Sequence, residues 1–144
     1  MAKILIVEDN ALNIKLFCDL LAAHGHEPQA VTDSRLALDA ARTFGPDLVI
    51  TDIQLPHVSG LELIRMLRKD KELGKVPIMA VTAYAAQGDE ERIRAAGAQS
   101  YVSKPISVVK FAATVEGLLA DTTPVLNAVE GLGAEGPGSD NRPT

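Results

Sequence analysis

Cysteines, aromatic residues and long apolar runs are scarce in this sequence, and each shortage excludes a class of protein. The single cysteine, Cys18, excludes an intramolecular disulfide. Every apolar run is shorter than the roughly 18 residues that a membrane span needs. The run that follows Lys3 is too short for the core of a secretory signal peptide. We therefore expect a cytoplasmic protein that inserts no segment into a membrane.

Basic residues are also fewer than acidic ones. The chain has 14 Lys and Arg and 19 Asp and Glu, so its formal net charge is −5. Nonspecific nucleic-acid binding takes most of its affinity from Lys and Arg on phosphates, so we expect no direct nucleic-acid partner. The three histidines, His24, His26 and His57, show no zinc-ligand spacing with Cys18. We interpret them as surface or loop residues.

The length and composition indicate one globular domain followed by a tail. The chain has 144 residues, 47% of them hydrophobic and 23% charged, which suits one domain better than two. From residue 121 on, glycine and proline become frequent and large apolar residues are few, so this segment buries too little surface to offset its ordering entropy. We predict a domain over 1–120 and a disordered Gly/Pro-rich tail over 121–144. The alternative is that residues 124–129 fold on a partner.

Strand and helix patterns alternate along the first 120 residues. Short apolar runs rich in β-branched residues predict strands at residues 3–7, 27–31, 47–51, 77–82 and 99–103. Segments with helical periodicity lie between them, and Gly25, Gly45 and Gly97 mark helix ends. Strict alternation with helix-length connections indicates a doubly wound α/β fold, which is a parallel five-stranded sheet with helices on both faces.

Polar residues mark the points where helices begin. Asp9 or Asn10 can cap the first helix, and Ser59-x-x-Glu62 is a capping box for the third. The second helix is expected to begin near residue 33 and to turn its apolar residues inward, namely Leu36, Ala37, Ala40, Ala41 and Phe44.

Polar and charged residues stand at the carboxyl ends of the predicted strands, where open α/β sheets form their sites. Glu8 and Asp9 follow the first strand, and Asp52 follows the third. Thr82 ends the fourth strand, and Lys104 follows the fifth. Each has an ordinary explanation, such as a helix cap, a turn cap before a proline or a surface lysine. Their shared place at one edge of one sheet argues for a site.

Three carboxylates at one edge resist ionising together, and a divalent cation relieves that repulsion. All-oxygen ligands suit Mg²⁺, so Glu8, Asp9 and Asp52 predict a magnesium site. Carboxylates are also known nucleophiles that become phosphorylated. Asp52 is therefore the candidate phosphoryl acceptor, with Lys104 and Thr82 as donors to the phosphoryl oxygens.

Two other functions fit a fold of this class. A Mg²⁺-dependent phosphatase with an aspartate nucleophile requires a second acid two residues after the nucleophile. Two residues after Asp52 the chain has Gln54, a poor general acid. A flavodoxin-like cofactor binder wants a glycine-rich phosphate loop after the first strand, whereas this loop is Glu8-Asp9-Asn10. The small number of aromatic residues, three Phe and two Tyr, also argues against a cofactor binder. We favour storage of a phosphoryl group over rapid turnover.

Four short motifs occur in order between residue 3 and about residue 120. They are Ile-Val-Glu-Asp-Asn at 6–10, Asp-Ile-Gln-Leu-Pro-x-x-Ser-Gly at 52–60, Val-Thr-Ala at 81–83 and Lys-Pro at 104–105. As a set they are specific, and through them the chain resembles the receiver domain of bacterial two-component response regulators. Residues 10–21 and 88–109 are similar to the DivK-like single-domain regulators of bacterial cell-cycle control.

The resemblance implies a flavodoxin-like (βα)5 fold with strand order 2-1-3-4-5 and assigns a role to each motif residue. Asp52 would be the phosphoacceptor. Glu8, Asp9, Asp52 and the main-chain carbonyl of Gln54 would hold Mg²⁺. The phosphoryl group would come from a histidine kinase or a histidine phosphotransferase. The protein would be a signalling phospho-acceptor and not an enzyme, apart from slow self-dephosphorylation.

The resemblance also implies a switch and an output surface. Thr82 and Lys104 would contact the phosphoryl group, and Tyr101 would turn inward when Thr82 moves. The Lys104–Pro105 peptide bond would be cis. Because no DNA-binding or enzymatic module follows the predicted domain, output would come from phosphorylation-dependent protein binding at the fourth helix, fifth strand and fifth helix. The process served would be cell-cycle or polarity control.

Overall fold

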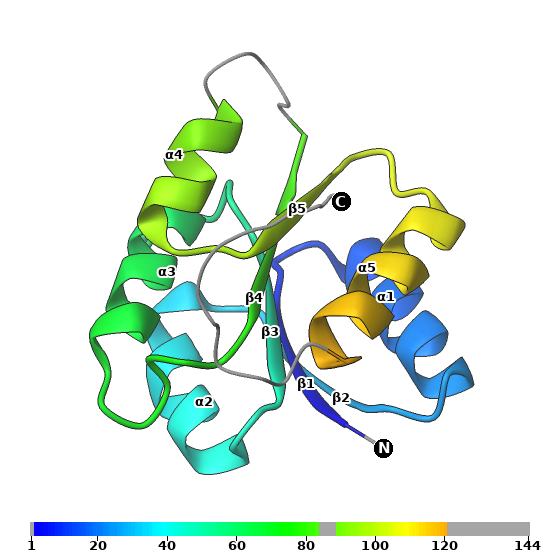
Figure 1. The fold of residues 1–144 in the computed structure, drawn as a ribbon, viewed down its shortest axis with the longest axis horizontal. Helices are drawn as coiled ribbons and strands as arrows, with labels where there is room; N and C mark the ends of the chain where they lie inside the picture. The colour runs from blue at the N-terminus through cyan, green and yellow to red at the C-terminus, as the bar shows by residue number, and fades with distance from the viewer. Residues whose placement is uncertain (1, 84–88, 121–144) are drawn as a thin grey trace.

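The computed structural model describes residues 2–83 and 89–120. These residues form a five-stranded parallel sheet with strand order β2-β1-β3-β4-β5 (Figure 1). The strands are β1 (Lys3–Val7), β2 (Glu27–Val31), β3 (Leu48–Asp52), β4 (Ile78–Thr82) and β5 (Ser100–Ser103). The predicted doubly wound, flavodoxin-like α/β fold and its strand order are confirmed. The predicted disordered tail over 121–144 lies outside the described residues.

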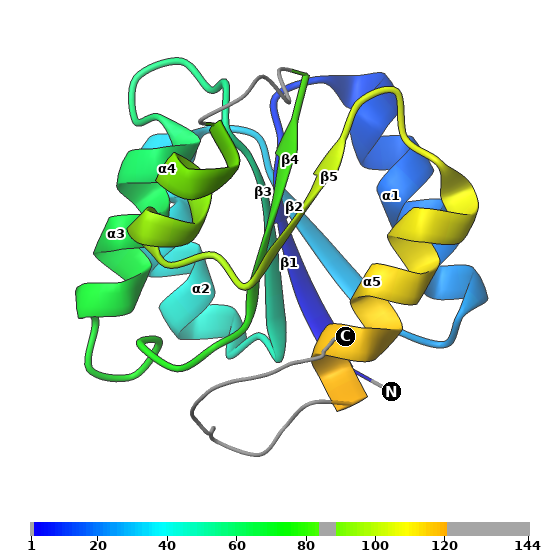
Figure 2. The same cartoon turned by 45° about the horizontal axis from the view of Figure 1, so that its top comes forward.

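Helices connect the strands and cover both faces of the sheet, as Figure 1 and Figure 2 show. On one face lie α1 (Ala11–Ala23) and α5 (Val108–Ala120). On the other face lie α2 (Ala37–Phe44), α3 (Gly60–Lys69) and α4 (Asp89–Ala96). Among the described helices, none combines the length and the apolar character that a membrane crossing requires.

Alternate residues of the central strands supply two hydrophobic cores, because successive side chains of a strand point to opposite faces. On the α1 and α5 face, Ile4 packs with Phe17 and Phe111, whose stacked rings have centroids 5.0 Å apart. On the other face, Leu5 packs with buried residues of α3, namely Leu63, Ile64 and Leu67. Burial of each such side chain stabilises the fold by about 1.5–3 kcal/mol. Coverage on both faces explains why β1, β3 and β4 are apolar without alternation.

The start of α2 differs from the prediction. Ser34–Leu36 forms a 3₁₀ turn, η1, and the Asp33 side chain caps it by accepting from the main-chain N–H of Arg35. Helix α2 begins only at Ala37. Leu36 belongs to this turn and is 60% exposed, so the prediction that it faces inward is wrong. Ala37 and Ala41 are buried, as predicted.

Candidate functional site

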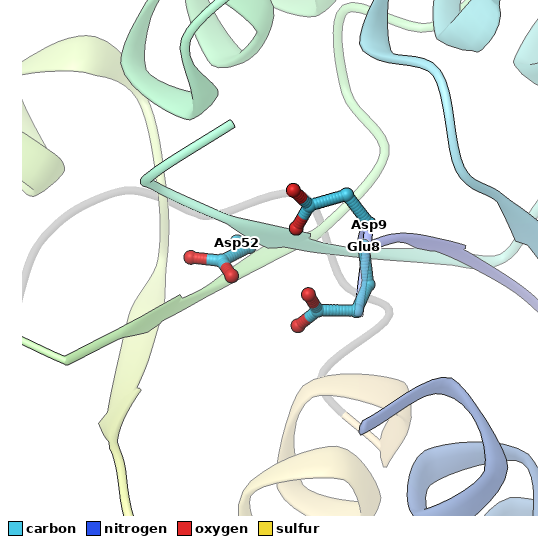
Figure 3. A group of neighbouring side chains, drawn as sticks. All are labelled: Glu8, Asp9 and Asp52. Carbon is cyan, nitrogen blue, oxygen red and sulfur yellow. The ribbon is translucent and has the colours of Figure 1, made fainter. Parts of the chain in front are cut away.

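The carboxyl ends of the strands bring the predicted site residues to one edge of the sheet. Asp52 is the last residue of β3, one residue further into the strand than predicted, and pairs in register with Val81 of β4. Glu8 and Asp9 follow β1 directly. Each of the three acids offers a carboxylate oxygen within 4.8 Å of those of the other two, and Figure 3 shows the side chains pointing to the same side. The structure therefore places together the acids that the sequence singles out.

The Asp52 carboxylate is buried and held by two hydrogen bonds. Its side chain is only 4% exposed. Oδ1 accepts from the main-chain N–H of Gln54 at 3.0 Å, and Oδ2 accepts from Nζ of Lys104 at 2.7 Å. One of the two donors is a cation, so this carboxylate has a counter-charge although it lies away from water. The two bonds set the direction in which its oxygens point.

Glu8 is the most deeply buried of the three acids. It is 1% exposed, and Oε2 accepts from the main-chain N–H of Asn10 at 3.0 Å. Burial raises the pKa of Glu8 above its ordinary value, and the charge of Asp52 acts in the same direction, against the lowering effects of the Asn10 N–H and of Lys104. The site therefore resists the full negative charge of its acids, and a bound cation would relieve this.

Lys104 provides the positive charge of the site. Its Nζ lies 2.7 Å from Asp52 Oδ2 and 3.5 Å from Glu8 Oε1. Burial lowers the pKa of Lys104, but the hydrogen bond to Asp52 and the charges of both acids outweigh this, so its pKa is raised and it stays charged. Its main-chain N–H donates to the carbonyl of Thr82 at 2.7 Å, and the Lys104–Pro105 bond is cis, as predicted.

The remaining predicted residues lie at different distances from the acid cluster. Thr82 ends β4 and is buried, on the strand next to Asp52. Gln54 is exposed, and its main chain contacts the Asp52 carboxylate. Tyr101 lies on β5, half-buried, and its hydroxyl donates to Oε1 of Glu90 on α4 at 3.2 Å. The structure thus places Thr82 at the end of the strand next to Asp52 and the Gln54 main chain against the Asp52 carboxylate. It places the Tyr101 hydroxyl against α4.

Two residues that the sequence did not single out support the site. The buried Ser34 Oγ donates to the carbonyl of Pro56 at 2.9 Å and accepts from the N–H of Val58 at 3.2 Å, which anchors the loop that follows Asp52. Asn13 donates through Nδ2 to Glu8 Oε1 at 3.4 Å. Asn10, which accepts from the Asn13 N–H, is a capping signal for the first turn of α1 that the sequence shows. Ser34 was expected only at the start of a helix, and no pattern pointed to its contact with the loop after Asp52.

The donor atoms of the cluster fit Mg²⁺. Among the described residues, Lys104 is the cation that lies within 4.0 Å of Glu8 and Asp52, so three clustered carboxylates have one ammonium group close by. All the side-chain donors are oxygen atoms, which Mg²⁺ prefers, whereas Zn²⁺ favours His and Cys. A further positive charge from Mg²⁺ would therefore match both the chemistry and the charge of this edge.

A family profile matches most of the chain. The profile of the response regulator receiver domain covers residues 4–116. The polar-differentiation response regulator DivK of Brucella ovis is 52% identical over 118 residues, which span 82% of this chain and 96% of that protein. DivK of Brucella anthropi has the same identity and coverage.

Solved structures with the same fold include two chains that this chain covers almost completely. The chemotaxis protein CheY4 of Vibrio cholerae has a TM-score of 0.78 and 25% identity, covering 82% of this chain and 98% of that one. The receiver domain of the sensor histidine kinase PA1611 from Pseudomonas aeruginosa has a TM-score of 0.77 and 30% identity, covering 83% and 98%. That structure has a magnesium ion coordinated in its active site cleft.

Proposed function

Because the chain belongs to the response regulator receiver domain family, we propose that it accepts a phosphoryl group on Asp52 from a histidine kinase or histidine phosphotransferase. The observation that carries the proposal is the Asp52 carboxylate itself. It is buried at the carboxyl edge of the sheet, between the Gln54 N–H and the Lys104 ammonium, with Glu8 and Asp9 beside it.

The acid cluster is the place that we assign to Mg²⁺. Receiver domains bind Mg²⁺ at an acidic pocket, and Glu8, Asp9 and Asp52 would hold it here together with the main-chain carbonyl of Gln54. The similar PA1611 receiver domain, which holds magnesium, supports this assignment. When bound, the ion would neutralise the oxygens of the incoming phosphoryl group.

The chain's own residues account for the transfer. A carboxylate oxygen of Asp52 attacks phosphorus and forms an O–P bond, while the N–P bond of the donor phosphohistidine breaks and its electron pair stays on the imidazole nitrogen. Lys104 already donates to Asp52 and would donate to a phosphoryl oxygen, and the Thr82 hydroxyl would donate to another. Gln54 offers no acid to protonate a leaving group, so we expect a signalling phospho-acceptor with slow self-dephosphorylation rather than an enzyme.

Output would come from protein binding. We assign Thr82 and Tyr101 to the switch, and the surface of α4, β5 and α5 to the downstream partner. The 52% identity to polar-differentiation regulators supports a role in cell-cycle or polarity control. We expect this signalling to take place in the cytoplasm, with no direct contact to nucleic acid.

Labelling by a small phosphoryl donor tests the proposal. Acetyl phosphate with Mg²⁺ should give one acid-labile phosphoryl group per chain, and Asp52→Asn should abolish it. Asp39→Asn, which changes an exposed acid on α2, is the matched control and should label like the wild type. Equal labelling of Asp52→Asn would show that the acceptor is wrong. Release of many phosphates per chain from phosphate esters would favour a hydrolase instead.

A further inference from the structure

A chain of polar contacts holds the Tyr101 hydroxyl at the surface of α4. The hydroxyl donates to Oε1 of Glu90 at 3.2 Å. The other carboxylate oxygen of Glu90, Oε2, accepts from Nε of Arg94 at 3.0 Å, one turn further along α4. Arg94 also donates through Nη1 to the carbonyl of Gln99 at 3.0 Å. Glu90 therefore has one oxygen for the cation that orients it and one for the phenol.

Gln99, the last residue of this series of contacts, is hydrogen-bonded to the sheet and to α3. The side-chain oxygen of Gln99 accepts from the main-chain N–H of Ile78, at the start of β4, at 2.8 Å. It also accepts from Nη2 of Arg68 on α3 at 2.6 Å. Arg68 donates through Nε to the carbonyl of Gly97 at 2.8 Å, at the end of α4. Glu90 and Arg94 are half-exposed. The segment that Arg94 contacts, from Gly97 to Gln99, is nevertheless held in place by hydrogen bonds to α3 and β4.

We propose that Glu90 is a positioning residue that holds Tyr101 with its hydroxyl outward, so that inward rotation of Tyr101 requires this hydrogen bond to break. The inference rests on the proposed function, which makes Tyr101 the switch. Both groups are partly exposed, so water replaces the lost bond and its net contribution is modest. Such a contact biases a two-state equilibrium without locking it, which a reversible switch requires.

The position of Glu90 connects the two parts of the switch. α4 begins at Asp89, after the segment that follows Thr82, and Glu90 is the second residue of this helix. A shift of α4 that accompanies movement at Thr82 would change the distance from Glu90 to Tyr101. Release of Tyr101 is therefore coupled to the position of α4 through this bond.

Titration of Tyr101 tests the contact in the protein without phosphoryl group or metal. Burial raises the pKa of Tyr101 first of all, and the hydrogen bond and charge of Glu90 raise it further. The chain has two tyrosines and no tryptophan, so Tyr84→Phe, outside the described residues, leaves Tyr101 as the only tyrosinate chromophore. In this background Glu90→Ala should lower the Tyr101 pKa. Glu91→Ala is the matched control, because the side chain of this exposed neighbour makes no hydrogen bond or ion pair within the described residues. It should leave the titration unchanged.

Binding of beryllium fluoride with Mg²⁺, a mimic of the phosphoryl group, tests the effect on the switch. Loss of one net hydrogen bond from the outward state should make binding about two- to tenfold tighter in Glu90→Ala. Tyr101→Phe also lacks the bond, so Glu90→Ala should add nothing further in that background. The proposal is overturned if the titration does not move, if binding does not tighten, or if Glu91→Ala has the same effect. Failure of wild-type Asp52 to accept a phosphoryl group would instead overturn the proposed function, a result that labelling gives separately.

Discussion

Gly60 packs directly against the main chain of Asp52. A Cβ atom at residue 60 would lie 2.1 Å from the Asp52 carbonyl oxygen and 2.5 Å from Ile53 Cα. The Gly60 N–H donates to the Ile53 carbonyl at 2.9 Å, and Ser59 caps α3 by accepting from the Glu62 N–H. The first turn of α3 therefore rests on the backbone that carries the proposed phosphoacceptor.

The first prediction concerns this close approach. Gly60→Ala should lower the free energy of unfolding by at least about 2 kcal/mol, because the new methyl group meets main-chain atoms that cannot move independently. Urea unfolding measures the loss. Gly117→Ala is the control, since nothing lies within 4 Å of a Cβ at that position in α5. It should raise the free energy of unfolding by about 0.5–1 kcal/mol through the helix propensity of alanine. Equal effects of the two changes would contradict the prediction.

The second prediction concerns metal binding at the acid cluster. Mg²⁺ should raise the midpoint of thermal unfolding relative to EDTA, because it binds only the folded state. A ligand of this kind, at a concentration of 100 times its dissociation constant, raises the free energy of unfolding by about 2.7 kcal/mol. Asp9→Asn should weaken this response, and without Mg²⁺ it should not destabilise the fold, because it removes one of three clustered carboxylates. Melting curves at matched ionic strength measure both effects. Asp39→Asn should respond to Mg²⁺ like the wild type, and the same response in Asp9→Asn would exclude Asp9 from the site.

The third prediction concerns the loop after Asp52. Ser34→Ala should lower the free energy of unfolding by about 1–3 kcal/mol, because the carbonyl of Pro56 and the N–H of Val58 both lose their hydrogen-bond partner. It should also slow labelling by acetyl phosphate, since this loop follows the acceptor. Urea unfolding and the initial labelling rate measure the two effects. Thr32→Ala, an exposed change two residues earlier, should alter neither. A stable Ser34→Ala variant would show that the two bonds contribute little.

The fourth prediction concerns the pH dependence of stability at Asp70. Its carboxylate accepts from Nε of Arg42 at 2.7 Å and from the main-chain N–H groups of Glu72 and Leu73, and the Arg42 bond in particular lowers the pKa of Asp70. The pKa of Asp70 is lower in the folded state than in the unfolded state. The charged Asp70 carboxylate therefore stabilises the fold fully at pH values above its unfolded pKa of about 3.9. This contribution is lost as the pH falls through the folded value.

Urea unfolding of Asp70→Asn from neutral to acidic pH measures this contribution. The midpoint should be lower than in the wild type at neutral pH, and the difference should shrink below about pH 4. Glu72→Gln changes an exposed acid nearby and should keep the pH dependence of the wild type. A difference that persists unchanged into acid would show that the Asp70 charge is not its source.

The acid cluster could be predicted from the sequence, whereas its supports could not. A parallel sheet places the carboxyl ends of its strands at one edge, so a list of the residues at those ends gave Glu8, Asp52 and Lys104 without coordinates. Ser34 contacts a loop more than 20 residues away, and the bond depends on how η1 meets that loop. The same junction explains the error at Leu36, because the 3₁₀ turn that contains it is held at Ser34.

The sequence alone determined the succession of strands and helices along the chain, the parallel sheet and the edge at which the site forms. It could do so because apolar periodicity and strict alternation are local properties. Tertiary structure decided which atoms meet. That Asp52 lies between the Gln54 N–H and Lys104, and that the Tyr101 hydroxyl reaches Glu90, depends on side-chain directions across packed elements. Those directions depend on how strands and helices distant in the sequence pack, and no local pattern records that packing.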